Sequence, residues 1–548
     1  NHEVEKLSRS GHTSWTLTDV DFTDGPYLDD NITATTLTPG SSGVGTGVSL
    51  TASAITGING DTGFQTTDVG RLVRIGDGYA KITARTDTTN ATMEILEDLG
   101  SSSATTNWSL GSFSDTTGHP SCVTFFEQRL VFAGTTDQPQ TVFFSKSGDY
   151  ENMNENRGGT VADDDAIIYT IASNQVNAIR FMTATRTLII GTAGGEFAVS
   201  GGGTDVAITP TNILIKKQSN HGAANVDAIP AGNATLFLQR AKRKLRELAY
   251  NFDVDGYVSP DLTILAEHIT EGGLTQLSYQ QEPNQIIWGT RDDGELVGLT
   301  YQREQQVVAW HRHKFGGTFG SGASATGFGV CESVATIPTD NSEYQVYVIV
   351  KRTINSVTRR YVEYINNFDF DETDDTTFNF LDSQLNYSGS STDTITGLDH
   401  LEGQTVSILA DGSTHPDKTV SSGSITLDRN VTKAKVGLGY TSLLQTMRLD
   451  AGSQDGTSQG KTKRIFDISI RLYESIGVEV GPDLSNMERI PFRSSADAMD
   501  SGLGVFTGDK EVEFRGNYET DGFIFVRQTQ PLPLTILSLY PRLQTNDG

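Results

Sequence analysis

The chain has 548 residues, and 41 Lys and Arg against 68 Asp and Glu give it a formal net charge of −27. This charge argues against generic binding to nucleic acid or to an anionic membrane, because long-range repulsion opposes approach, although DNA could still traverse a passage without sticking to it. The 57 glycines, with many Thr and Ser residues between short apolar runs, indicate an all-β, turn-rich protein.

The N-terminal part of the chain predicts one strand and then a small separate module. Residues 1–41 hold a strand at 14–22, followed by a Thr-, Ser- and Gly-rich linker. Residues 42–110 hold five short apolar runs separated by Gly, Asp and Asn, about the size of a small barrel. We therefore expect an inserted small β-barrel at 42–110. Because the chain begins at Asn1 without a Met, we also expect it to be part of a longer product.

A repeat of roughly 50 residues follows, opened each time by an apolar-x-x-apolar pair. The openings are Val123, Val176, Val226, Leu274 and Val334. Second and third apolar runs follow each opening, and fourth runs occur at 166–171, 208–215, 262–269 and 307–313. Four strands per unit at this period are typical of propeller blades, and a solenoid of hairpins is the competing interpretation. We predict a β-propeller at 111–376 with five four-stranded sheets.

The rest of the chain predicts a second insertion and then a closing segment. Residues 377–450 alternate apolar runs with Gly-containing turns, which suggests an inserted β-sandwich. A flexible connector is expected at 451–460. Residues 451–548 then hold four strands, which we expect to close the propeller by pairing with the strand near Trp15.

Several acidic and histidine clusters are candidate sites for a metal ion. Consecutive carboxylates at 163–165 are usually solvated, and Asp253 with Asp255 lacks the closing Glu of a calcium loop. His311 and His313 share one face of a predicted strand, but no third zinc ligand can be named. We predict no metal site and no cofactor.

No catalytic residues are predicted. The sequence has no nucleophile elbow, phosphate loop or metalloprotease motif, and no spacing singles out a pair of carboxylates. Cys122 and Cys331 are expected to be two small buried side chains. No run of about 18 apolar residues occurs, so no membrane-spanning segment is predicted.

One basic run is the single candidate contact site. It comprises Arg240, Lys242, Arg243, Lys244 and Arg246. These residues fall on the turn of a predicted hairpin, where long cationic side chains can reach a DNA phosphate or an acidic partner. A solvated turn with no partner is the competing interpretation.

The sequence resembles the tail tubular or nozzle proteins of short-tailed phages and related prophages. The resemblance is carried by HPSCVTFFEQRLVFAGTTDQPQTVFFSKSGDYENM at 119–153, RELAYNFDVDGYVSPDLTILAEHI at 246–269 and LSYQQEPNQIIW at 277–288. It covers most of residues 9–480 and is a structural signature without a catalytic motif.

This resemblance implies a structural virion protein without enzymatic activity. We expect a ring, as a homo-hexamer, below the portal and adaptor proteins, which extends the channel for DNA ejection. The implied partners are further copies of the chain, the portal and adaptor proteins, the tail fibres, and double-stranded DNA that passes without sequence recognition. A tail-associated propeller that binds or degrades a glycan is the alternative.

Overall fold

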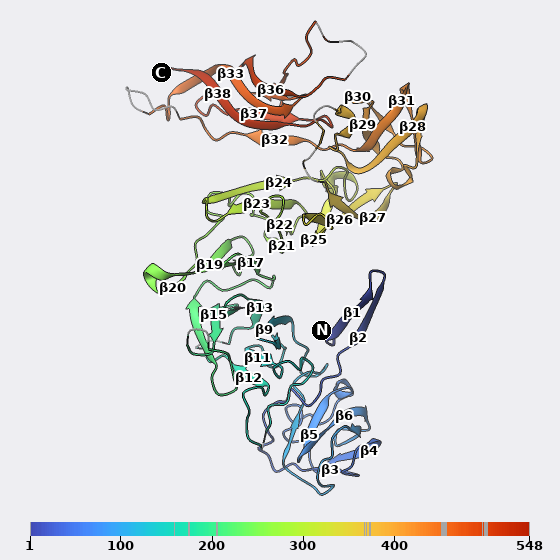
Figure 1. The fold of residues 1–548 in the computed structure, drawn as a ribbon, viewed down its shortest axis with the longest axis vertical. Helices are drawn as coiled ribbons and strands as arrows, with labels where there is room; N and C mark the ends of the chain where they lie inside the picture. Colours follow the sequence, from blue (N-terminus) through green and yellow to red (C-terminus); the bar gives the residue numbers. More distant parts are fainter. Residues whose placement is uncertain are drawn as a thin grey trace. The chain divides into compact units, whose positions relative to one another are not determined.

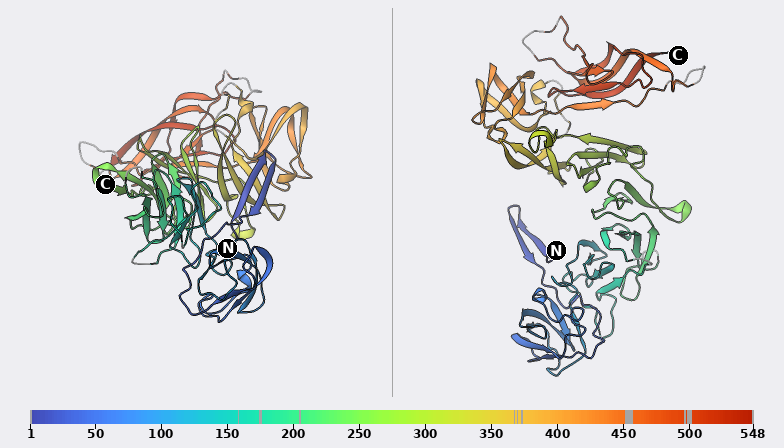
Figure 2. Two further views of the ribbon diagram at one scale, coloured as in Figure 1. Left: turned by 60° about the horizontal axis from the view of Figure 1, so that its bottom comes forward. Right: turned by 180° about the vertical axis from the view of Figure 1, so that it is seen from behind.

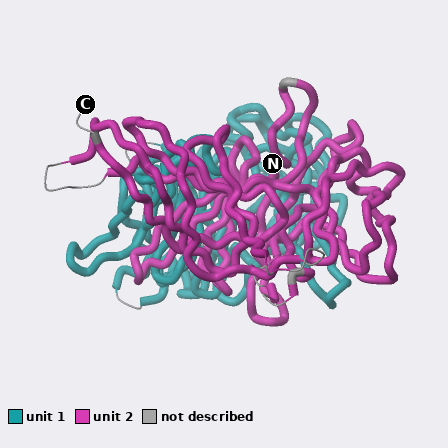
Figure 3. Tube along the Cα trace, turned by 90° about the horizontal axis from the view of Figure 1, so that it is seen from above, with its two compact units in different colours: residues 1–277 teal, residues 278–548 magenta. Residues whose placement is uncertain are grey.

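A computed structural model describes residues 2–546 except 158, 174–175, 204–205, 367, 369, 372–373, 451–456, 496 and 498–501. The chain forms two compact units, Asn1–Leu277 (unit 1) and Ser278–Gly548 (unit 2), coloured separately in Figure 3. Within the described residues, the regular elements are β-strands and short 3₁₀ helices, with no α-helix. No helix in this part of the chain is long and apolar enough to cross a membrane.

Unit 1 begins with a two-stranded hairpin of β1 (Glu5–Gly11) and β2 (Ser14–Asp19). The strand predicted near Trp15 is therefore present, but it pairs with its own neighbour in the sequence. A backbone hydrogen bond from Val20 N to Val4 O, 2.8 Å long, continues the pairing at the base of the hairpin. In Figures 1 and 2 the hairpin projects from the rest of unit 1.

The first module is a six-stranded sheet that encloses its own apolar core. Its strands are β3 (Leu37–Pro39), β4 (Gly45–Ala52), β5 (Leu72–Ile75), β6 (Gly78–Arg85), β7 (Asn90–Ile95) and β8 (Trp108–Leu110). Their order in the sheet is β3-β4-β7-β6-β5-β8. Alternate residues of β7 are buried, as a strand with one face toward a core requires. The core includes Leu50, Val73, Met93 and Ile95.

Three four-stranded antiparallel sheets complete unit 1, each built from consecutive strands. The first contains β9 (Cys122–Phe126), β10 (Arg129–Ala133), β11 (Thr141–Phe144) and β12 (Ile167–Thr170). The second contains β13 (Ile179–Ala184), β14 (Leu188–Thr192), β15 (Gly195–Ser200) and β16 (Leu214–Ser219). The third contains β17 (Ile229–Ala231), β18 (Ala234–Leu238), β19 (Leu245–Asn251) and β20 (Gly256–Val258).

These blade sheets pack face to face. Val131 and Val142 of the first sheet share a core with Leu188 of the second. On the opposite face of the second sheet, Ile189 shares a core with Phe237 of the third. Neighbouring residues of one strand point to opposite faces, so the middle strands are buried on both sides. This explains their continuous apolar runs.

One predicted fourth strand is wrong. The run at 262–269 forms turns, and the third sheet instead ends with β20. Asp261 accepts hydrogen bonds from the backbone N and the Oγ1 of Thr263, which bends the chain at the start of this run. Leu265 is left 93% exposed, so the apolar spacing that suggested a strand does not reflect burial in a blade.

The next two sheets continue the repeat. One contains β21 (Leu274–Gln280), β22 (Ile286–Arg291), β23 (Leu296–Gln302) and β24 (Val307–His313). The other has three strands where four were expected, namely β25 (Val330–Pro338), β26 (Tyr344–Ile354) and β27 (Val357–Ile365). Trp288 of the first and Val348 of the second lie in one shared core.

Residues 382–438 form the second small module. Its strands are β28 (Asp382–Thr396), β29 (Thr405–Ala410), β30 (Ser413–Thr419) and β31 (Ser424–Leu438). We expected a sandwich of two sheets, and the hydrogen bonds define one four-stranded sheet. The pairing of its two 15-residue strands shifts register at three places, as at bulges that bend a sheet. A separate apolar core includes Val406, Val431 and Val436.

The C-terminal strands form a module of their own. They are β32 (Ser442–Gln445), β33 (Thr462–Ser475), β34 (Glu479–Gly481), β35 (Glu488–Arg489), β36 (Phe506–Glu513), β37 (Phe525–Gln528) and β38 (Thr535–Asn546). They make two sheets, β32-β37-β34-β35 and β36-β33-β38, and residues of both, such as Ile468 and Val526, share a core.

This arrangement differs from the predicted closure, in which the strands at 451–548 pair with the strand near Trp15. The alternate buried residues of β33 pack on the neighbouring C-terminal sheet, so its apolar face is already covered. Part of the connector expected at 451–460 lies outside the described residues.

The predicted fold class is confirmed: the chain is all-β, with consecutive blade sheets of the propeller type and two further small β modules. Within unit 1 the three blade sheets follow one another in sequence order, as the colours of Figure 1 allow the reader to trace.

Replacing Trp288 with Ala should lower the free energy of unfolding by about 3–5 kcal/mol. Its side chain is 4% exposed, and its Nε1 donates to Gln280 Oε1 at 3.0 Å. Trp310, half-buried on the edge strand β24, is the matched control, and replacing it with Ala should lower the free energy of unfolding clearly less. Chemical denaturation followed by circular dichroism would measure both, and equal losses would contradict this account of the shared core.

Candidate functional site

The five predicted cations lie around the turn that joins β18 to β19. Gln239 N donates to Lys244 O at 2.8 Å, and Lys242 N donates to Gln239 O at 2.7 Å, which closes the turn. Lys242 adopts a positive φ of 63°, in the left-handed region that such turns use. The hairpin turn predicted from the sequence is present and holds Arg240, Lys242, Arg243 and Lys244, whereas Arg246 lies on β19.

Lys244 is paired inside unit 1. Its Nζ lies 2.9 Å from Asp261 Oδ2 and 3.3 Å from Glu267 Oε1. These hydrogen bonds raise the pKa of Lys244. Burial alone would raise the pKa of Asp261, but hydrogen bonds from Thr263 and Lys244 outweigh it and lower that pKa. Lys244 thus holds the 261–267 loop against the turn.

Arg246 and Arg243 are also engaged with neighbouring residues. Arg246 donates from Nε to Gln239 Oε1 at 2.9 Å and from Nη1 to Ser259 O at 2.8 Å. Arg243 Nη2 lies 4.0 Å from Glu271 Oε1, at the limit of an ion pair. Three of the five cations therefore serve the loop that follows β20, which favours a structural role for this part of the run.

Arg240 and Lys242 are the two members with no ion pair in the described part of the chain. Arg240 is exposed, whereas Lys242 is half-buried. Their backbones are fixed: Arg240 N donates to Gly222 O at 3.0 Å, and Leu274 N donates to Lys242 O at 2.8 Å. Two cations are a weak anchor for a strongly charged phosphate backbone, so contact with DNA or an acidic partner here stays a prediction.

The acidic cluster at 163–165 has a structural function. Asp165 is 2% exposed, and its carboxylate accepts from Ala162 N and pairs with Lys146 at 3.1 Å. The backbone carbonyls of Asp163 and Asp165 accept from the buried Arg129 guanidinium at 2.7 Å and 2.6 Å. The cluster therefore holds a buried cation of the protein itself. Among the described residues, no group of three or more His, Cys, Asp or Glu could hold a metal ion.

Two further acidic pairs lie in turns. Asn251 Oδ1 accepts from Asp253 N at 2.8 Å, and Asp255 has a left-handed φ of 46° in the short turn between β19 and β20. Asp292 and Asp293 lie in the hairpin turn between β22 and β23, where Arg291 pairs with Asp293.

His311 and His313 contact each other, as their shared strand face predicts. His311 Nδ1 lies 2.6 Å from His313 Nε2, and both rings pack against Trp288. Gly298 lies directly across the sheet, where a Cβ would approach His311 Cε1 to 2.1 Å. Burial lowers the pKa of His311, and it lowers the pKa of His313 to about 3. These two rings are neutral, packed parts of the blade core.

Both cysteines are buried free thiols. Burial raises the pKa of Cys122 to about 11 and that of Cys331 to about 12. Thiolate, the reactive form, is therefore scarce at neutral pH for either residue.

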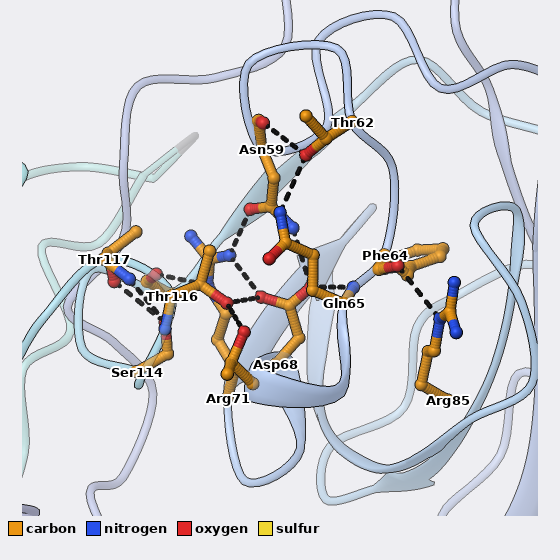
Figure 4. A network of polar contacts seen from close by, with 12 residues as sticks. Asn59, Thr62, Phe64, Gln65, Asp68, Arg71, Arg85, Ser114, Thr116 and Thr117 are labelled. Atoms are coloured by element: carbon orange, nitrogen blue, oxygen red, sulfur yellow. Dashed lines mark hydrogen bonds and ion pairs between the residues drawn. The ribbon is translucent and has the colours of Figure 1, made fainter.

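A buried network in the first module was not foreseen. Arg71 is 1% exposed, pairs with Asp68 at 2.9 Å, and donates to Asn59 Oδ1 at 2.7 Å (Figure 4). Asp68 also accepts from Thr116 Oγ1 at 2.8 Å, and Arg71 Nε donates to Gly111 O at 2.7 Å. The network joins the 59–71 loop to the strand-free segment after β8. The only sequence signal, two charged residues three apart, is common on surfaces.

A cavity of about 490 Å³ lies beside this network. Its lining includes Asn59, Gln65, Thr116 and three carboxylates. Arg71 Nη2 has no hydrogen-bond partner among the described residues, and no dashed line reaches it in Figure 4. This nitrogen is sealed from solvent, so a ligand in the cavity could not reach it without a rearrangement. The network supports the module and gives the cavity no free cation.

A second buried ionic cluster joins the three-stranded sheet to the 382–438 module. Arg352 is fully buried, donates from Nε to Gly316 O at 2.8 Å, and pairs with Glu363. Asp382 Oδ2 accepts from Gly316 N at 2.6 Å. Burial raises the pKa of Asp382 to about 6, although the Gly316 hydrogen bond and Arg352 oppose the shift. One arginine thus faces two carboxylates, and one negative charge is left uncompensated.

Comparisons with known proteins assign no family. No family model and no curated protein matches the chain. The β-propeller domain of Cps50 (Swd1) from Myceliophteria thermophila aligns at 10% identity over 54% of this chain and 84% of its own, with a TM-score of 0.28. An auxiliary nutrient binding protein from Bacteroides thetaiotaomicron aligns at 10% identity over 73% and 96%, with a TM-score of 0.26.

A putative 6-phosphogluconolactonase from Bacteroides fragilis aligns at 9% identity over 62% of this chain and all of its own, with a TM-score of 0.26. Similarity at these scores carries no argument about this chain, neither for its function nor for a catalytic activity.

Replacing Arg246 with Ala should lower the free energy of unfolding by about 1–3 kcal/mol, because it leaves Gln239 and the Ser259 carbonyl without their donor. The matched change of the exposed Arg240 to Ala should stay within about 0.5 kcal/mol. Urea unfolding of both variants would measure the difference. A free, partner-binding role for the whole run would instead leave both variants equally stable.

Replacing Asp382 with Asn should stabilise the protein at pH 7 by about 3 kcal/mol. A pKa raised to about 6 means that the folded state binds this proton more tightly than the unfolded state. In the wild type, protonated Asp382 therefore contributes to the free energy of unfolding below pH 4, and this contribution is lost as the pH rises to about 6.

The difference in unfolding free energy between D382N and wild type should consequently grow between pH 4 and 6 and stay constant above. Measuring this difference cancels the contributions of His311 and His313. Glu363→Gln, which removes the direct partner of Arg352, should destabilise at pH 7 and serves as the contrasting variant. A difference for D382N that does not vary with pH would contradict the assignment.

Proposed function

We propose that the chain is a structural subunit of a short phage tail, which assembles into a ring around the DNA channel and performs no covalent chemistry. The identification with a tail protein rests on the sequence resemblance described above. Assembly into a ring is supported by the surfaces that the structure leaves uncovered.

The observation that carries the assembly argument is a cluster of apolar side chains on the outer face of the sheet β25–β27, beside the ion pairs of Glu332 with Lys351 and Arg360. In register across this sheet, Ala335 lies opposite Tyr347 and Tyr347 opposite Tyr364. Ile349 lies opposite Val362 on the same face, and Val362 is 73% exposed. The outer face of a half-buried antiparallel sheet is normally polar. Adjacent exposed apolar side chains of this kind mark an interaction surface.

The charge of the chain is compatible with a channel for DNA. A net charge of −27 repels phosphate, so DNA could slide past without being held. Salt screens such repulsion over about 10 Å at roughly 0.1 M, so the carboxylates that act on DNA would have to line the bore closely. Within the basic turn, Lys244 is paired with Asp261 and Glu267, whereas Arg240 and Lys242 have no ion pair in the described part of the chain.

The purified chain should self-associate into a closed ring and should not retain double-stranded DNA at physiological salt, because the exposed apolar face favours association and the acidic surface repels phosphate. Light scattering coupled to gel filtration would give the mass, electron microscopy the ring, and filter binding the DNA affinity. The portal and adaptor proteins and the tail fibres are the further partners that we propose.

Either of two results would overturn the proposed function. One is a monomer at all accessible concentrations, including in the presence of portal and adaptor proteins. The other is hydrolysis of a host glycan by the purified chain, which would favour the alternative of a glycan-degrading tail propeller.

A further inference from the structure

The N-terminal hairpin, residues 5–19, presents an apolar face that nothing in unit 1 covers; we call it the arm. Leu7 lies opposite Leu17 and Arg9 opposite Trp15, so these four side chains share one face. Leu7 is 62% exposed, Trp15 52% and Leu17 60%. A lone two-stranded hairpin is marginally stable in water, and this one exposes its largest side chains.

The tip of the arm is braced and cationic. The Arg9 guanidinium lies over the Trp15 ring at 5.5 Å, and Arg9 Nη2 contacts His12 Nδ1 at 2.8 Å. Trp15 Nε1 donates to His12 O at 3.2 Å. The sequence from Lys6 to Thr18 contains no Asp or Glu. A pre-ordered aromatic side chain beside a cation is a favourable anchor for a partner, because little side-chain entropy remains to be lost.

A second exposed projection in unit 1 has the opposite charge. Residues 250–258, which we call the acidic turn, comprise the end of β19, the connection to β20 and β20 itself, and carry Phe252 at 88% exposure and Val254 at 63%. Asp253 and Asp255 alternate with these two side chains, and 247–261 contains no Lys or Arg. The turn is also braced, because Tyr250 Oη donates to Asp255 Oδ1 at 2.5 Å.

The tip of the arm and the acidic turn are thus complementary in charge, since the acids Glu5 and Asp19 lie at the base of the arm, and each surface carries exposed apolar side chains. Both project from unit 1 in Figures 1 and 2, and their exposure shows that neither is covered within that unit. Copies with a charge of −27 repel one another at long range, so association needs a local contact between opposite charges beside buried apolar surface. The arm and the acidic turn supply such a pair of surfaces.

We propose that the arm of one copy binds the acidic turn of the next copy, with Trp15 and Leu17 against Phe252 and Val254 and Arg9 beside Asp253. Two different surfaces on one chain give a head-to-tail contact, which generates a closed ring when the rotation between copies permits. This inference rests on the proposed ring and names the surfaces that form it.

The test is an exchange of charges between the two surfaces. Arg9→Glu places an acid against the acidic turn, and Asp253→Lys places a cation against the arm. Each variant alone should self-associate at least about tenfold more weakly than wild type. Both residues are exposed, and neither side chain forms a hydrogen bond to the core that the described structure contains. Thermal unfolding should therefore match wild type.

An equimolar mixture of the two variants should assemble again. The arm of the Arg9→Glu copy then meets the lysine of the Asp253→Lys copy, and the unchanged arm of the latter meets the unchanged acidic turn of the former. The double variant R9E/D253K should also assemble alone. Lys216→Glu, an exposed position on β16, changes the net charge by the same amount as Arg9→Glu and should leave assembly unchanged.

Light scattering during gel filtration distinguishes the outcomes. If the wild type forms a ring and neither variant weakens its assembly, the proposed contact is wrong, whereas the proposed ring is not contradicted. Weakening by both variants without recovery in the mixture would also overturn it, because a contact between copies must be restored by exchange. A wild-type chain that stays monomeric would overturn the ring and this contact together.

Discussion

The structure depends on one constraint: a small β-sheet has two faces, and both must be covered. The first blade sheet shows how this is met, since Val131 and Val142 pack toward the second sheet while Phe132 and Phe143 pack into a separate cluster on the other side. Alternation along a strand makes each residue belong to one face only, so each middle strand takes part in two cores. Consecutive packing of sheets follows, because each new sheet covers one face and exposes another that needs covering. The sheet β25–β27 leaves part of one face uncovered, with Val362 73% exposed.

The sequence was sufficient to predict strands whose burial shows as a local pattern of apolar residues. Continuous apolar runs such as those of β14 and β18 predicted strands, and these are fully buried. It failed where a side chain close in sequence redirected the backbone. Asp261 binds the backbone at Thr263 and turns the 262–269 run away from the sheet. The destination of the C-terminal strands could not be predicted either, because β33 has the same alternation whether it closes a propeller or packs on its neighbours.

The burial of charged side chains could not be predicted from the sequence, for a different reason. Arg71, Arg129 and Arg352 are each at most 2% exposed, although arginine is usually a surface residue. Their burial depends on acceptors distant in sequence: Gly111 for Arg71, the 163–165 carbonyls for Arg129, and Glu363 with Gly316 for Arg352. Each joins a loop or module to a sheet where apolar packing alone would leave carbonyl groups unpaired. Of the candidate site, the sequence predicted the position of the basic turn but not the acids at 261 and 267 that occupy Lys244.

The pairing of carboxylates with cations also affects how such an acidic chain can assemble. Many of its carboxylates form ion pairs within the chain, such as Asp68–Arg71 and Glu363–Arg352. Because their partners neutralise them, these carboxylates contribute little to the electrostatic potential at a distance. The exposed, unpaired carboxylates carry the long-range repulsion, which salt weakens over about 10 Å. A contact that buries aromatic and aliphatic side chains is not weakened in that way. Copies of this chain would therefore associate through apolar surface, with local charges fixing which surfaces meet. The exposed side chains of the arm, the acidic turn and the β25–β27 face have the chemistry that this division of roles requires.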